Sequence, residues 1–424
     1  MKIIKGFKAA KSALSRQAPR ELIGGDEQEQ SVRDIINDVA QRGDAAILEY
    51  TRKFDGVTPK TWEVDREQIA KARNKIAPDL LEALNLAAKR IHSFHMRQRE
   101  SLWSGDIEGM SWMVRPLHRV GIYAPRGTAP YPSSLLMTAI PAKVAGVKEV
   151  ILATPPKKIP PVILAAADIA EVDRVFSIGG AQAIAAMALG TKTIPSVDKV
   201  CGPGSIYVTL AKKLLYGVVG IDGLYGPSEV LIIADNDANP AYCAADLLAQ
   251  AEHGTLSAAI LVTTSKGFAS KVNHEVGQQI KKLPRREIAL ESLENNGLIA
   301  VVDSIDEAIE LANLYAPEHV LLLVEDAKSC IDQLSNAGCI VIGKRATVAI
   351  GDYIAGPSHV LPTEGTARFS SPLNITDFIK LVNVVTVEQD NLEELGEAAA
   401  TIARAEGFEA HAQAVERRLG KGHD

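Results

Sequence analysis

Four short segments each combine a carboxylate or amide side chain with a histidine, and such pairs can bind a metal or move protons. In the first, Gly351–Phe369, Asp352 and His359 stand among the glycines and prolines that form turns. We expect this segment to be a rigid loop that presents a metal ligand or a proton-transfer group.

The second pair is Gln250 and His253, which close a helix expected to begin near Pro240 and to end at Gly254. Because the two residues are three positions apart, their side chains share one helical face and could grip a metal from the helix end. An exposed helix terminus explains this pair equally well.

The third pair is Glu318 and His319, directly before the apolar segment 320–324. Two adjacent titratable groups could serve two different proton transfers at one reacting carbon. Taken alone, a Glu-His pair before a strand is more typical of a solvated loop.

The fourth pair lies near the C-terminus, where Glu406 and His411 belong to the segment Glu406-Gly-Phe-Glu-Ala-His411. A mixed set of nitrogen and oxygen ligands can be drawn from these segments: Gln250, His253, Asp352 and His411. Such a set is acceptable to zinc and leaves positions for a substrate, as a catalytic site requires. Because glutamine is an uncommon zinc ligand, the spacing alone leaves the metal open.

Three loops rich in Gly, Pro and small polar residues could hold a nucleotide, namely 123–134, 179–182 and 202–205. Each precedes a helical pattern, and backbone N–H groups at a helix start attract phosphate. Each loop alone is more typical of an ordinary turn. No Gly-x-Gly-x-x-Gly follows a strand, so the usual dinucleotide fingerprint is missing.

Apolar spacing predicts the elements that must position these residues. Helices are expected over 27–42, 66–76 and 78–99. From about Val114, short apolar segments alternate with loops and Ala-rich helices, which is typical of parallel sheets. The expected strands are 149–154, 174–178, 230–234, 259–263, 297–302, 320–324 and 339–342. After Asp377 we expect helix to about Ala405.

The expected fold class is therefore α/β, with two doubly wound, Rossmann-like domains that lack the dinucleotide fingerprint, a helical N-terminal arm and a helical C-terminal tail. A chain of 424 residues is long enough for two cores, because single cores stop growing near roughly 250 to 300 residues.

Composition limits the partners. A net charge of -6 without a concentrated Lys/Arg run argues against nucleic acid or an anionic membrane. Neither a leader segment nor a membrane-spanning apolar segment is visible. The four cysteines show no Cys-x-x-Cys spacing, which favours a reducing compartment. We therefore expect a cytoplasmic enzyme that acts on small molecules.

Eleven motifs, in order over nearly the whole chain, resemble the histidinol dehydrogenase family. Among them are Ala129-Pro-Tyr-Pro-Ser-Ser134, Gly226-Pro-Ser-Glu229, Ala249-Gln-Ala-Glu-His253, Pro317-Glu-His319, His359-Val-Leu-Pro-Thr and Glu406-Gly-x-x-Ala-His411. The resemblance implies zinc- and NAD-dependent oxidation of L-histidinol through the aldehyde to L-histidine, a four-electron reaction that uses two NAD and is the last step of histidine biosynthesis.

The resemblance also implies a role for each matching residue. The zinc ligands, for one ion per subunit, are Gln250, His253, Asp352 and His411. The proton acceptors are Glu318, which activates water, and His319, which takes the alcohol proton. The substrate contacts are Ser228, Gln250, His253, His319, Asp352, His359, Glu406 and His411. The NAD contacts are Tyr123, Gln182 and Ser205.

Family members are homodimers in which the tail reaches into the partner subunit, so Glu406 and His411 are expected to complete the other protomer's site. The boundaries that we predict are 1–20 for the arm, 21–120 with 232–373 for the first domain, 121–231 for the second domain and 374–424 for the swapped tail. The first domain carries most metal and catalytic residues, and the second carries the cofactor loops.

Six residues depart from those usual in the family: Arg126, Thr138, Ser205, Leu224, Tyr225 and Ser358. Ser205 replaces an asparagine and offers fewer hydrogen bonds to NAD. Arg126 can pair with a carboxylate, phosphate or sulfonate. The alternative is therefore a paralogous zinc- and NAD-dependent dehydrogenase of another small polar or anionic alcohol, such as a hydroxysulfonate. A metal-dependent hydrolase with Glu318 as base is a third hypothesis.

Overall fold

The computed structural model describes residues 1–15, 25–102, 106–107, 110–125 and 130–420. The chain divides into two compact units. The main unit contains Met1–Arg99 and Pro116–Ile379, and the second unit contains Glu100–Arg115 and Lys380–Asp424.

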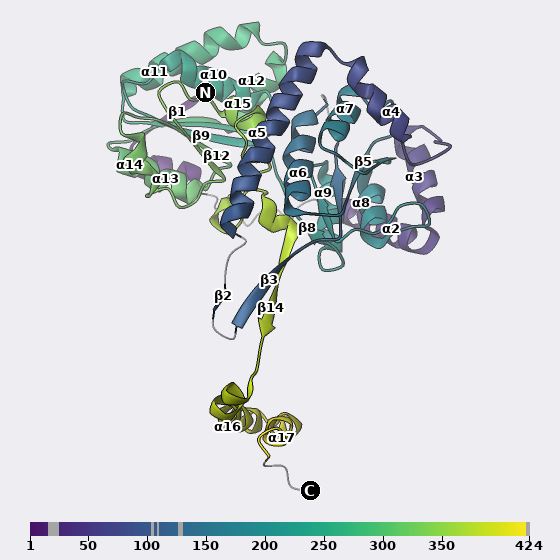
Figure 1. Cartoon of the computed structure of the whole chain (residues 1–424). Coiled ribbons are helices and arrows are strands. Elements are labelled where there is room, and N and C mark those ends of the chain that lie inside the picture. The colour runs from purple at the N-terminus through teal and green to yellow at the C-terminus, as the bar shows by residue number, and fades with distance from the viewer. Residues whose placement is uncertain (16–24, 103–105, 108–109, 126–129, 421–424) are drawn as a thin grey trace. The chain divides into compact units, whose positions relative to one another are not determined.

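The first sheet of the main unit has six parallel strands (Figure 1). Their order is β1 (Lys2–Lys5), β11 (Gly297–Val301), β10 (Ala258–Thr263), β9 (Glu229–Ala234), β12 (His319–Leu323) and β13 (Cys339–Ile342). The inner strands β9, β10 and β12 are buried at every residue and mostly apolar, as expected for parallel strands covered on both faces. One face packs on α10 (Pro240–Ala251), α11 (Lys266–Gln279) and α12 (Arg286–Asn296). The other packs on α1 (Phe7–Leu14), α13 (Ile305–Tyr315) and α14 (Ala327–Ile331).

The second sheet of the main unit has five parallel strands. Their order is β6 (Arg174–Ser177), β5 (Glu149–Thr154), β4 (Arg119–Tyr123), β7 (Lys199–Cys201) and β8 (Gly220–Ile221). The chain proceeds outward in both directions from β4, so the topological switch point lies between β4 and β7. The loops after these two strands are the place where such sheets bind ligands.

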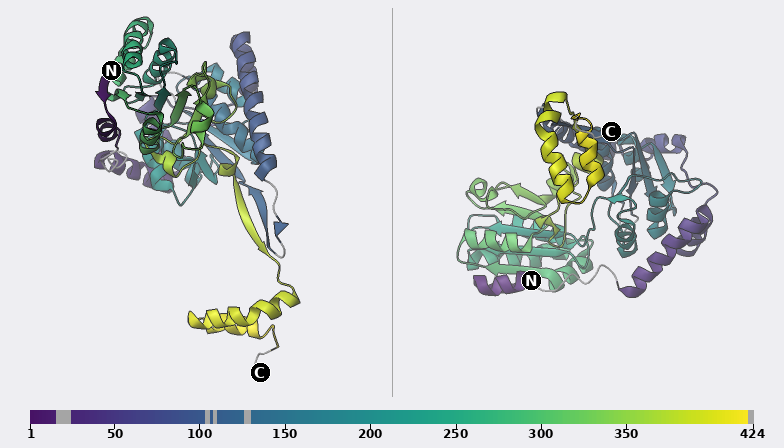
Figure 2. Two further views of the ribbon diagram at one scale, coloured as in Figure 1. Left: turned by 90° about the vertical axis from the view of Figure 1, so that its left-hand side faces the viewer. Right: turned by 90° about the horizontal axis from the view of Figure 1, so that it is seen from below.

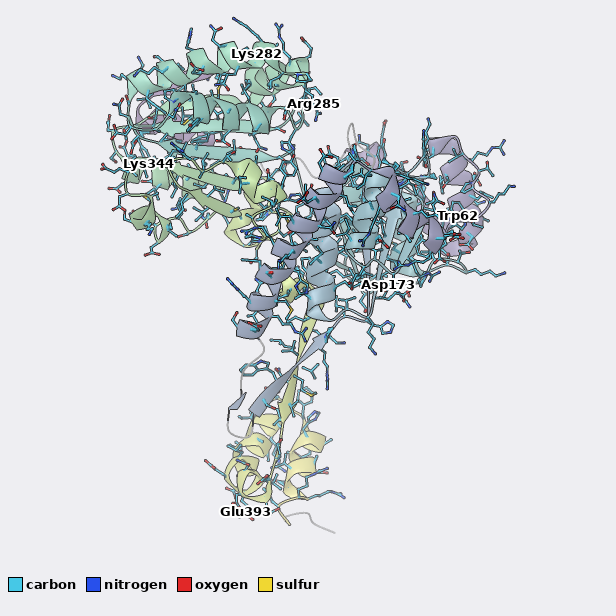
Figure 3. All side chains as sticks on the ribbon, turned by 45° about the horizontal axis from the view of Figure 1, so that its top comes forward. Trp62, Asp173, Lys282, Arg285, Lys344 and Glu393 are labelled. Carbon is cyan, nitrogen blue, oxygen red and sulfur yellow. The ribbon has the colours of Figure 1, made fainter. Side chains whose placement is uncertain are left out.

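Helices cover both faces of the five-stranded sheet. On one face lie α6 (Pro132–Ala145) and α7 (Pro161–Ile169). On the other lie α2 (Asp26–Arg42), α3 (Asp44–Asp55), α8 (Gly180–Leu189) and α9 (Ile206–Leu215). Trp62, labelled in Figure 3, is buried in this second core, and its carbonyl accepts the Ser177 N–H at 2.7 Å.

Helix α5 (Pro78–Leu102) links the two halves of the main unit. The Arg90 Nε donates to the Ile354 carbonyl at 2.8 Å, beyond the six-stranded sheet. The Arg99 Nη1 donates to the Val144 carbonyl of α6 at 3.0 Å. The remaining short elements are α4 (Arg66–Ala70), η1 (Lys71–Lys75), η2 (Ile280–Lys282), α15 (Val348–Tyr353), η3 (Thr366–Arg368) and η4 (Ile375–Phe378).

The second unit combines a small sheet with a helix pair. The sheet order is β14 (Ile379–Val385), β3 (Met110–Pro116) and β2 (Asp106–Ile107). Helices α16 (Gln389–Ala405) and α17 (Glu409–Glu416) then pack against each other, as Figure 2 shows. The Arg404 guanidinium pairs with Glu409 at 3.0 Å and with Glu416 at 2.7 Å, which fastens the two helices together.

The predicted α/β class with parallel sheets is confirmed, and the seven expected strands are present within one or two residues of their predicted ends. The domain boundaries remain a prediction. No helix in the described part of the chain is long and apolar enough to cross a membrane.

Two expected helical segments are wrong in part. The N-terminal arm begins with strand β1, which pairs with β11 at the sheet edge. The segment Ile379–Val385 after Asp377 is strand β14, and helix begins only at Gln389. Both segments are rich in β-branched residues, which favour strands where a neighbouring strand offers pairing.

Candidate active site

Glu318 and His319 lie at the amino end of β12, where the six-stranded sheet opens toward the second half of the main unit. Glu318 is 6% exposed, and its Oε2 accepts the backbone N–H of Glu229 at 2.8 Å. Burial raises the pKa of Glu318 to about 7. Ser228 directly precedes Glu229, so its backbone lies beside this carboxylate.

His319 is held between two carboxylates. Its Nε2 lies 3.1 Å from Asp352 Oδ1, and its Nδ1 lies 3.9 Å from Glu318 Oε2. Burial opposes a charged ring, but the hydrogen bond to Asp352 and the charge of Glu318 outweigh it and raise the pKa of His319. Its buried Nδ1 has no hydrogen-bond partner among the described residues. The ring is therefore oriented by Asp352 and keeps one nitrogen available.

Asp352 comes from α15, a short helix that begins after Thr347. Burial by itself would raise the pKa of Asp352, but the hydrogen bond and charge of His319 lower it overall. His359 and His253 also favour the ionised carboxylate. Asp352, which was expected in a loop, thus lies in the last turn of α15, where its carboxylate contacts His319 and interacts electrostatically with His253 and His359. Such a carboxylate suits a cation as well as a proton transfer.

His359 connects this loop to the other half of the main unit. Its Nδ1 lies 2.5 Å from the Asp352 carbonyl, which accepts, so Nδ1 carries the proton. Its Nε2 therefore accepts from the Ser134 hydroxyl, at 3.0 Å. Ser134 is the last residue of the predicted loop 123–134 and lies in the first turn of α6. The motif quoted above contains Ser134, but only the fold shows its contact with His359.

Two of the six residues that differ from those usual in the family, Thr138 and Ser358, lie next to this contact in α6 and in the segment of His359. The Ser358 hydroxyl donates to the Met137 carbonyl at 3.2 Å and accepts the Val360 N–H at 3.2 Å. The Thr138 hydroxyl donates to the Ser134 carbonyl at 2.8 Å. Both side chains are buried, at 4% and 1% exposure. They satisfy backbone groups between α6 and the loop and do not line an open site.

Gln250 and His253 lie at the C-terminal end of α10, as predicted. Gln250 is 4% exposed, and its amide nitrogen has no partner among the described residues. His253 keeps contact with solvent, yet the atoms around it desolvate the ring and lower its pKa. The negative charge of Asp352 raises the pKa of His253 and so opposes the effect of desolvation, which shows that the two side chains interact electrostatically.

The other two candidate residues, Glu406 and His411, belong to the second unit. Near Glu406, the Arg404 guanidinium pairs with Glu409 and with Glu416. Within the described ranges, no group of three or more His, Cys, Asp or Glu side chains could hold a metal. The main unit of a single chain thus contains three of the four expected metal ligands, Gln250, His253 and Asp352, and the expected fourth, His411, belongs to the second unit.

The candidate cofactor residues surround the switch point of the five-stranded sheet. The Tyr123 hydroxyl, at the end of β4, accepts the Gly180 N–H at the start of α8 at 3.0 Å. Burial raises the pKa of Tyr123 to about 12, so this hydroxyl stays protonated. Gln182, two residues further along α8, is buried, and its side-chain oxygen has no partner among the described residues.

Gly202 brings the third loop against the first. It has φ +114°, and a Cβ at this position would clash with the Tyr123 carbonyl oxygen. Ser205 follows as the N-cap of α9 and is exposed, without a side-chain bond to the helix. Tyr123, Gly180 and Gly202, one from each predicted loop, therefore lie close together, and beside them the Gln182 side-chain oxygen has no partner in the described chain.

A buried ion pair that the sequence did not reveal fixes the 202–205 loop. Lys212 of α9 and Asp222 are 2% and 0% exposed, and their charged atoms are 2.5 Å apart. Lys212 donates to the Gly202 carbonyl at 3.0 Å, and Asp222 accepts the Gly202 N–H at 2.7 Å. Tyr225, a departing residue, places its ring 5.0 Å from the Lys212 ammonium. Leu224 has no structural explanation.

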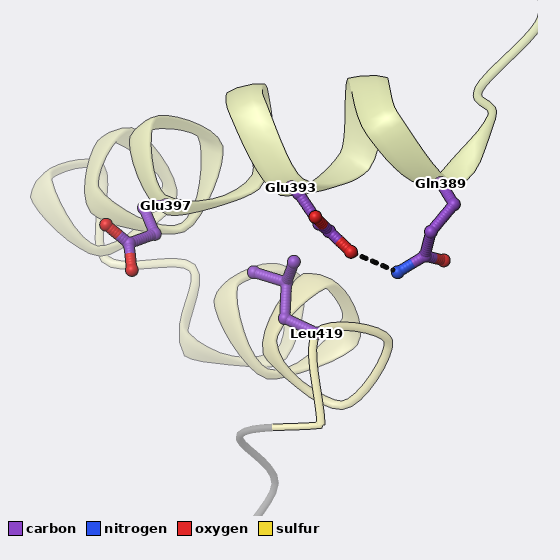
Figure 4. Close-up of a pocket in the computed structure, with 4 residues that line it drawn as sticks. All are labelled: Gln389, Glu393, Glu397 and Leu419. Atoms are coloured by element: carbon purple, nitrogen blue, oxygen red, sulfur yellow. Dashed lines mark hydrogen bonds between the residues drawn. The ribbon is translucent and has the colours of Figure 1, made fainter.

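Arg126 lies outside the described residues, so its proposed contact with an anion stays a prediction. A hollow of about 250 Å³ lies in the second unit, lined by Gln389, Glu393, Glu397 and Leu419 (Figure 4). Its lining includes none of the candidate residues, and its main polar contact is a bond of 2.9 Å from Gln389 to Glu393.

Nearly the whole chain is similar to known proteins. A family model described as histidinol dehydrogenase matches residues 19–419. A histidinol dehydrogenase of Dehalococcoides mccartyi (strain CBDB1) is 54% identical over 437 residues, which cover 99% of this chain and 100% of the relative. One of Bacillus cereus (strain ATCC 14579) is 45% identical over 422 residues, 98% of each chain. The crystal structure of histidinol dehydrogenase from Elizabethkingia anophelis matches with a TM-score of 0.92 at 36% identity, covering 99% of this chain and 98% of that chain.

Proposed function

Because the chain belongs to the histidinol dehydrogenase family, whose members are NAD-dependent oxidoreductases that act on CH–OH groups, we propose that it oxidises L-histidinol to L-histidine in two steps. The first step converts the alcohol to the aldehyde, and the second converts the hydrated aldehyde to the carboxylate. The single observation that supports this proposal best is the arrangement of Glu318, His319 and Asp352, which supplies two different proton acceptors at one place.

His319 accepts the alcohol proton in the first step. The Asp352 carboxylate accepts from Nε2–H, which leaves the lone pair of Nδ1 for the substrate. Asp352 orients the ring and stabilises the imidazolium that forms, a role that requires the short contact of 3.1 Å.

Glu318 acts in the second step by removing a proton from the water that hydrates the aldehyde. A general base works best when its pKa lies near the working pH. Burial raises the pKa of Glu318 to about 7, which is suited to that task. Because the two acceptors are adjacent, each reaction has its own base without moving the substrate.

We further propose that Gln250, His253 and Asp352 bind one zinc ion together with His411. These residues fit zinc in two respects. Their donors are the neutral nitrogen and oxygen atoms and single carboxylate that a catalytic zinc accepts. The unpartnered amide of Gln250 also becomes a carbonyl ligand when it is flipped. When bound, zinc polarises the substrate oxygen and lowers the cost of removing its proton.

The fourth ligand, His411, and the substrate contact Glu406 come in this proposal from the second unit of a partner chain. Large apolar side chains remain exposed on the second unit, which is typical of a surface covered by another subunit. They include Leu381, Val385, Leu395, Ile402 and Phe408. The active enzyme would then be a homodimer with shared sites.

NAD is proposed to bind at the switch point of the five-stranded sheet, with Tyr123, Gln182 and Ser205 as contacts. Two successive NAD molecules each accept one hydride. The hydrogen bond from Ser134 to His359 joins helix α6, which follows the first of the proposed NAD loops, to the segment that carries the proposed substrate contact His359. Ser228 and His359 are the proposed contacts of the polar end of the substrate, beside Glu318 and Asp352 respectively.

The departing residues support histidinol more than another alcohol. Thr138 and Ser358 bond to backbone groups, and Tyr225 packs on the buried Lys212, so three of the six changes have structural partners. Membership of an oxidoreductase family argues against the hydrolase hypothesis.

The test is NADH formation by the zinc-loaded enzyme with L-histidinol and with a panel of other alcohols, including hydroxysulfonates. The expected result is turnover of L-histidinol at a kcat/KM at least about a hundredfold above any other alcohol in the panel, which corresponds to roughly 3 kcal/mol. A higher kcat/KM for another alcohol would replace the proposed substrate.

A further inference from the structure

Asp246 is a buried carboxylate close to the proposed metal ligands that the mechanism does not use. It lies in α10 one turn before Gln250, and its side chain is 5% exposed. Asp246, Gln250 and His253 are spaced by four and three residues, so their side chains follow one face of the helix and its end. The start of α15 contacts this face through Asp246.

Both contacts of Asp246 that define its position go to the first residues of α15. Its Oδ1 accepts the Thr347 hydroxyl at 2.6 Å and the Val348 N–H at 3.2 Å. Thr347 is the N-cap of α15, and the first N–H groups of a helix have no partner inside the helix. A carboxylate of one helix therefore completes the start of another.

The contact with Asp246 has a large effect on the position of α15 because this helix is short. A helix of six residues, Val348–Tyr353, is not stable by itself, so its tertiary contacts place it. Val348 is buried in the core above the six-stranded sheet, and beyond the other end Arg90 binds the Ile354 carbonyl. Asp352 stands between these anchors, five residues after Thr347.

We propose that Asp246 is a positioning residue for the metal site. Its carboxylate fastens α15 to α10, so that Asp352 meets Gln250 and His253 at the separation that zinc needs. This inference rests on the proposed zinc site. Partners of this kind, which do not bind the metal themselves, change metal affinity by about 10- to 100-fold when they are removed.

The first variant is Thr347→Val, which keeps the branched shape and removes the hydroxyl that donates to Asp246 and also accepts the Ala349 N–H at 3.4 Å. Its matched control is Ser304→Ala, which removes the cap of α13, where Ser304 accepts the Glu307 N–H at 3.2 Å. Both variants lose one helix cap, but only the first affects α15. Asp246→Ala and Asp246→Asn complete the set, because asparagine keeps an oxygen that can accept both bonds.

Two measurements are made on the full-length protein. Competition with a chelator gives the dissociation constant for zinc, and the visible spectrum of the cobalt-loaded protein reports the ligand geometry. Thr347→Val and Asp246→Ala are expected to weaken zinc binding by on the order of tenfold and to change the cobalt spectrum. Asp246→Asn and Ser304→Ala are expected to stay near the wild type in both.

Wild-type zinc affinity in Thr347→Val would overturn the inference, even if Asp246→Ala fails to fold. An equal loss in Ser304→Ala would also overturn it, since general destabilisation would then explain the effect. If the unmodified protein binds no zinc, the proposed metal site itself is wrong and the inference fails with it. That outcome is distinguishable because it precedes any substitution.

Discussion

Replacing Glu318 by glutamine separates the two half-reactions. Glutamine has nearly the same shape, and its side-chain oxygen can still accept the Glu229 N–H that Glu318 binds at 2.8 Å. What is lost is the base. Since a positioned general base contributes roughly 10² to 10⁴-fold, we expect aldehyde oxidation to fall by at least about a hundredfold. Alcohol oxidation, which uses His319, should fall by less than about tenfold.

The same substitution has a calculable effect on stability. The pKa of Glu318 is raised from 4.5 to about 7 in the folded protein. When the pKa of a carboxyl group is higher in the folded than in the unfolded state, the protein becomes less stable as the pH rises from the unfolded-state pKa to the folded-state pKa. This loss amounts to up to about 3 kcal/mol above pH 7, because one pKa unit corresponds to about 1.4 kcal/mol. Glutamine does not ionise, so the variant should be at least as stable as the wild type in alkaline buffer.

The assay uses single-turnover NADH formation, started either from histidinol or from histidinal, together with thermal unfolding at acidic and alkaline pH. In the wild type, the rate with histidinal should fall about tenfold for each pH unit below the pKa of about 7. An equal loss of both half-reactions in Glu318→Gln would refute the assigned role. A flat pH profile with histidinal in the wild type would refute the role of its raised pKa.

Three further predictions concern the metal and the cofactor loops. His253→Ala should lose zinc and activity together, while the metal-free forms of the variant and the wild type unfold at nearly the same temperature, since the side chain is exposed; metal analysis with thermal unfolding checks this, and an active, zinc-free variant would contradict it. Ser205→Asn should lower the KM for NAD several-fold, by roughly 1 kcal/mol for an added hydrogen bond, with kcat little changed; an unchanged KM would remove Ser205 from the NAD site. Gly202→Ala should destabilise the protein by about 2 kcal/mol or more, because φ is +114° and the Cβ meets the Tyr123 carbonyl; denaturant unfolding measures this, and wild-type stability would contradict the backbone argument.

The sequence was sufficient for the parallel sheets because their strands are apolar segments with a clear start and end. Strand β5 occupies the predicted residues 149–154. The segment 379–385 was misjudged because its pairing with β3 depends on a strand far away in the chain. Strand β1 was missed for the same reason, because its four residues form a strand only by pairing with β11, which is distant in the sequence.

Within the candidate site, the sequence predicted which residues could carry the chemistry but not what each one contacts. The histidine and carboxylate motifs identified Glu318, His319 and Asp352. That Asp352 bonds to His319 follows from the placement of α15, which no local pattern encodes. The polar core contacts of Lys212 with Asp222 and of Asp246 with Thr347 were missed for the same reason.

The residues that depart from the family pattern show a converse limit of the sequence. Among them, Thr138 and Ser358 contribute to the hypothesis that the substrate is another small alcohol. The structure places both hydroxyls on backbone carbonyls in buried positions. A residue type by itself does not distinguish a substrate contact from a hydrogen bond inside the protein.

The central claim is that one site carries out both oxidations, and the number of NADH molecules formed from each histidinol tests it most directly. With limiting L-histidinol, excess NAD and the zinc-loaded dimer, the account predicts two NADH for each histidinol, with histidine as the product and little free aldehyde. One NADH with accumulation of the aldehyde, or no NADH from histidinol, would contradict it.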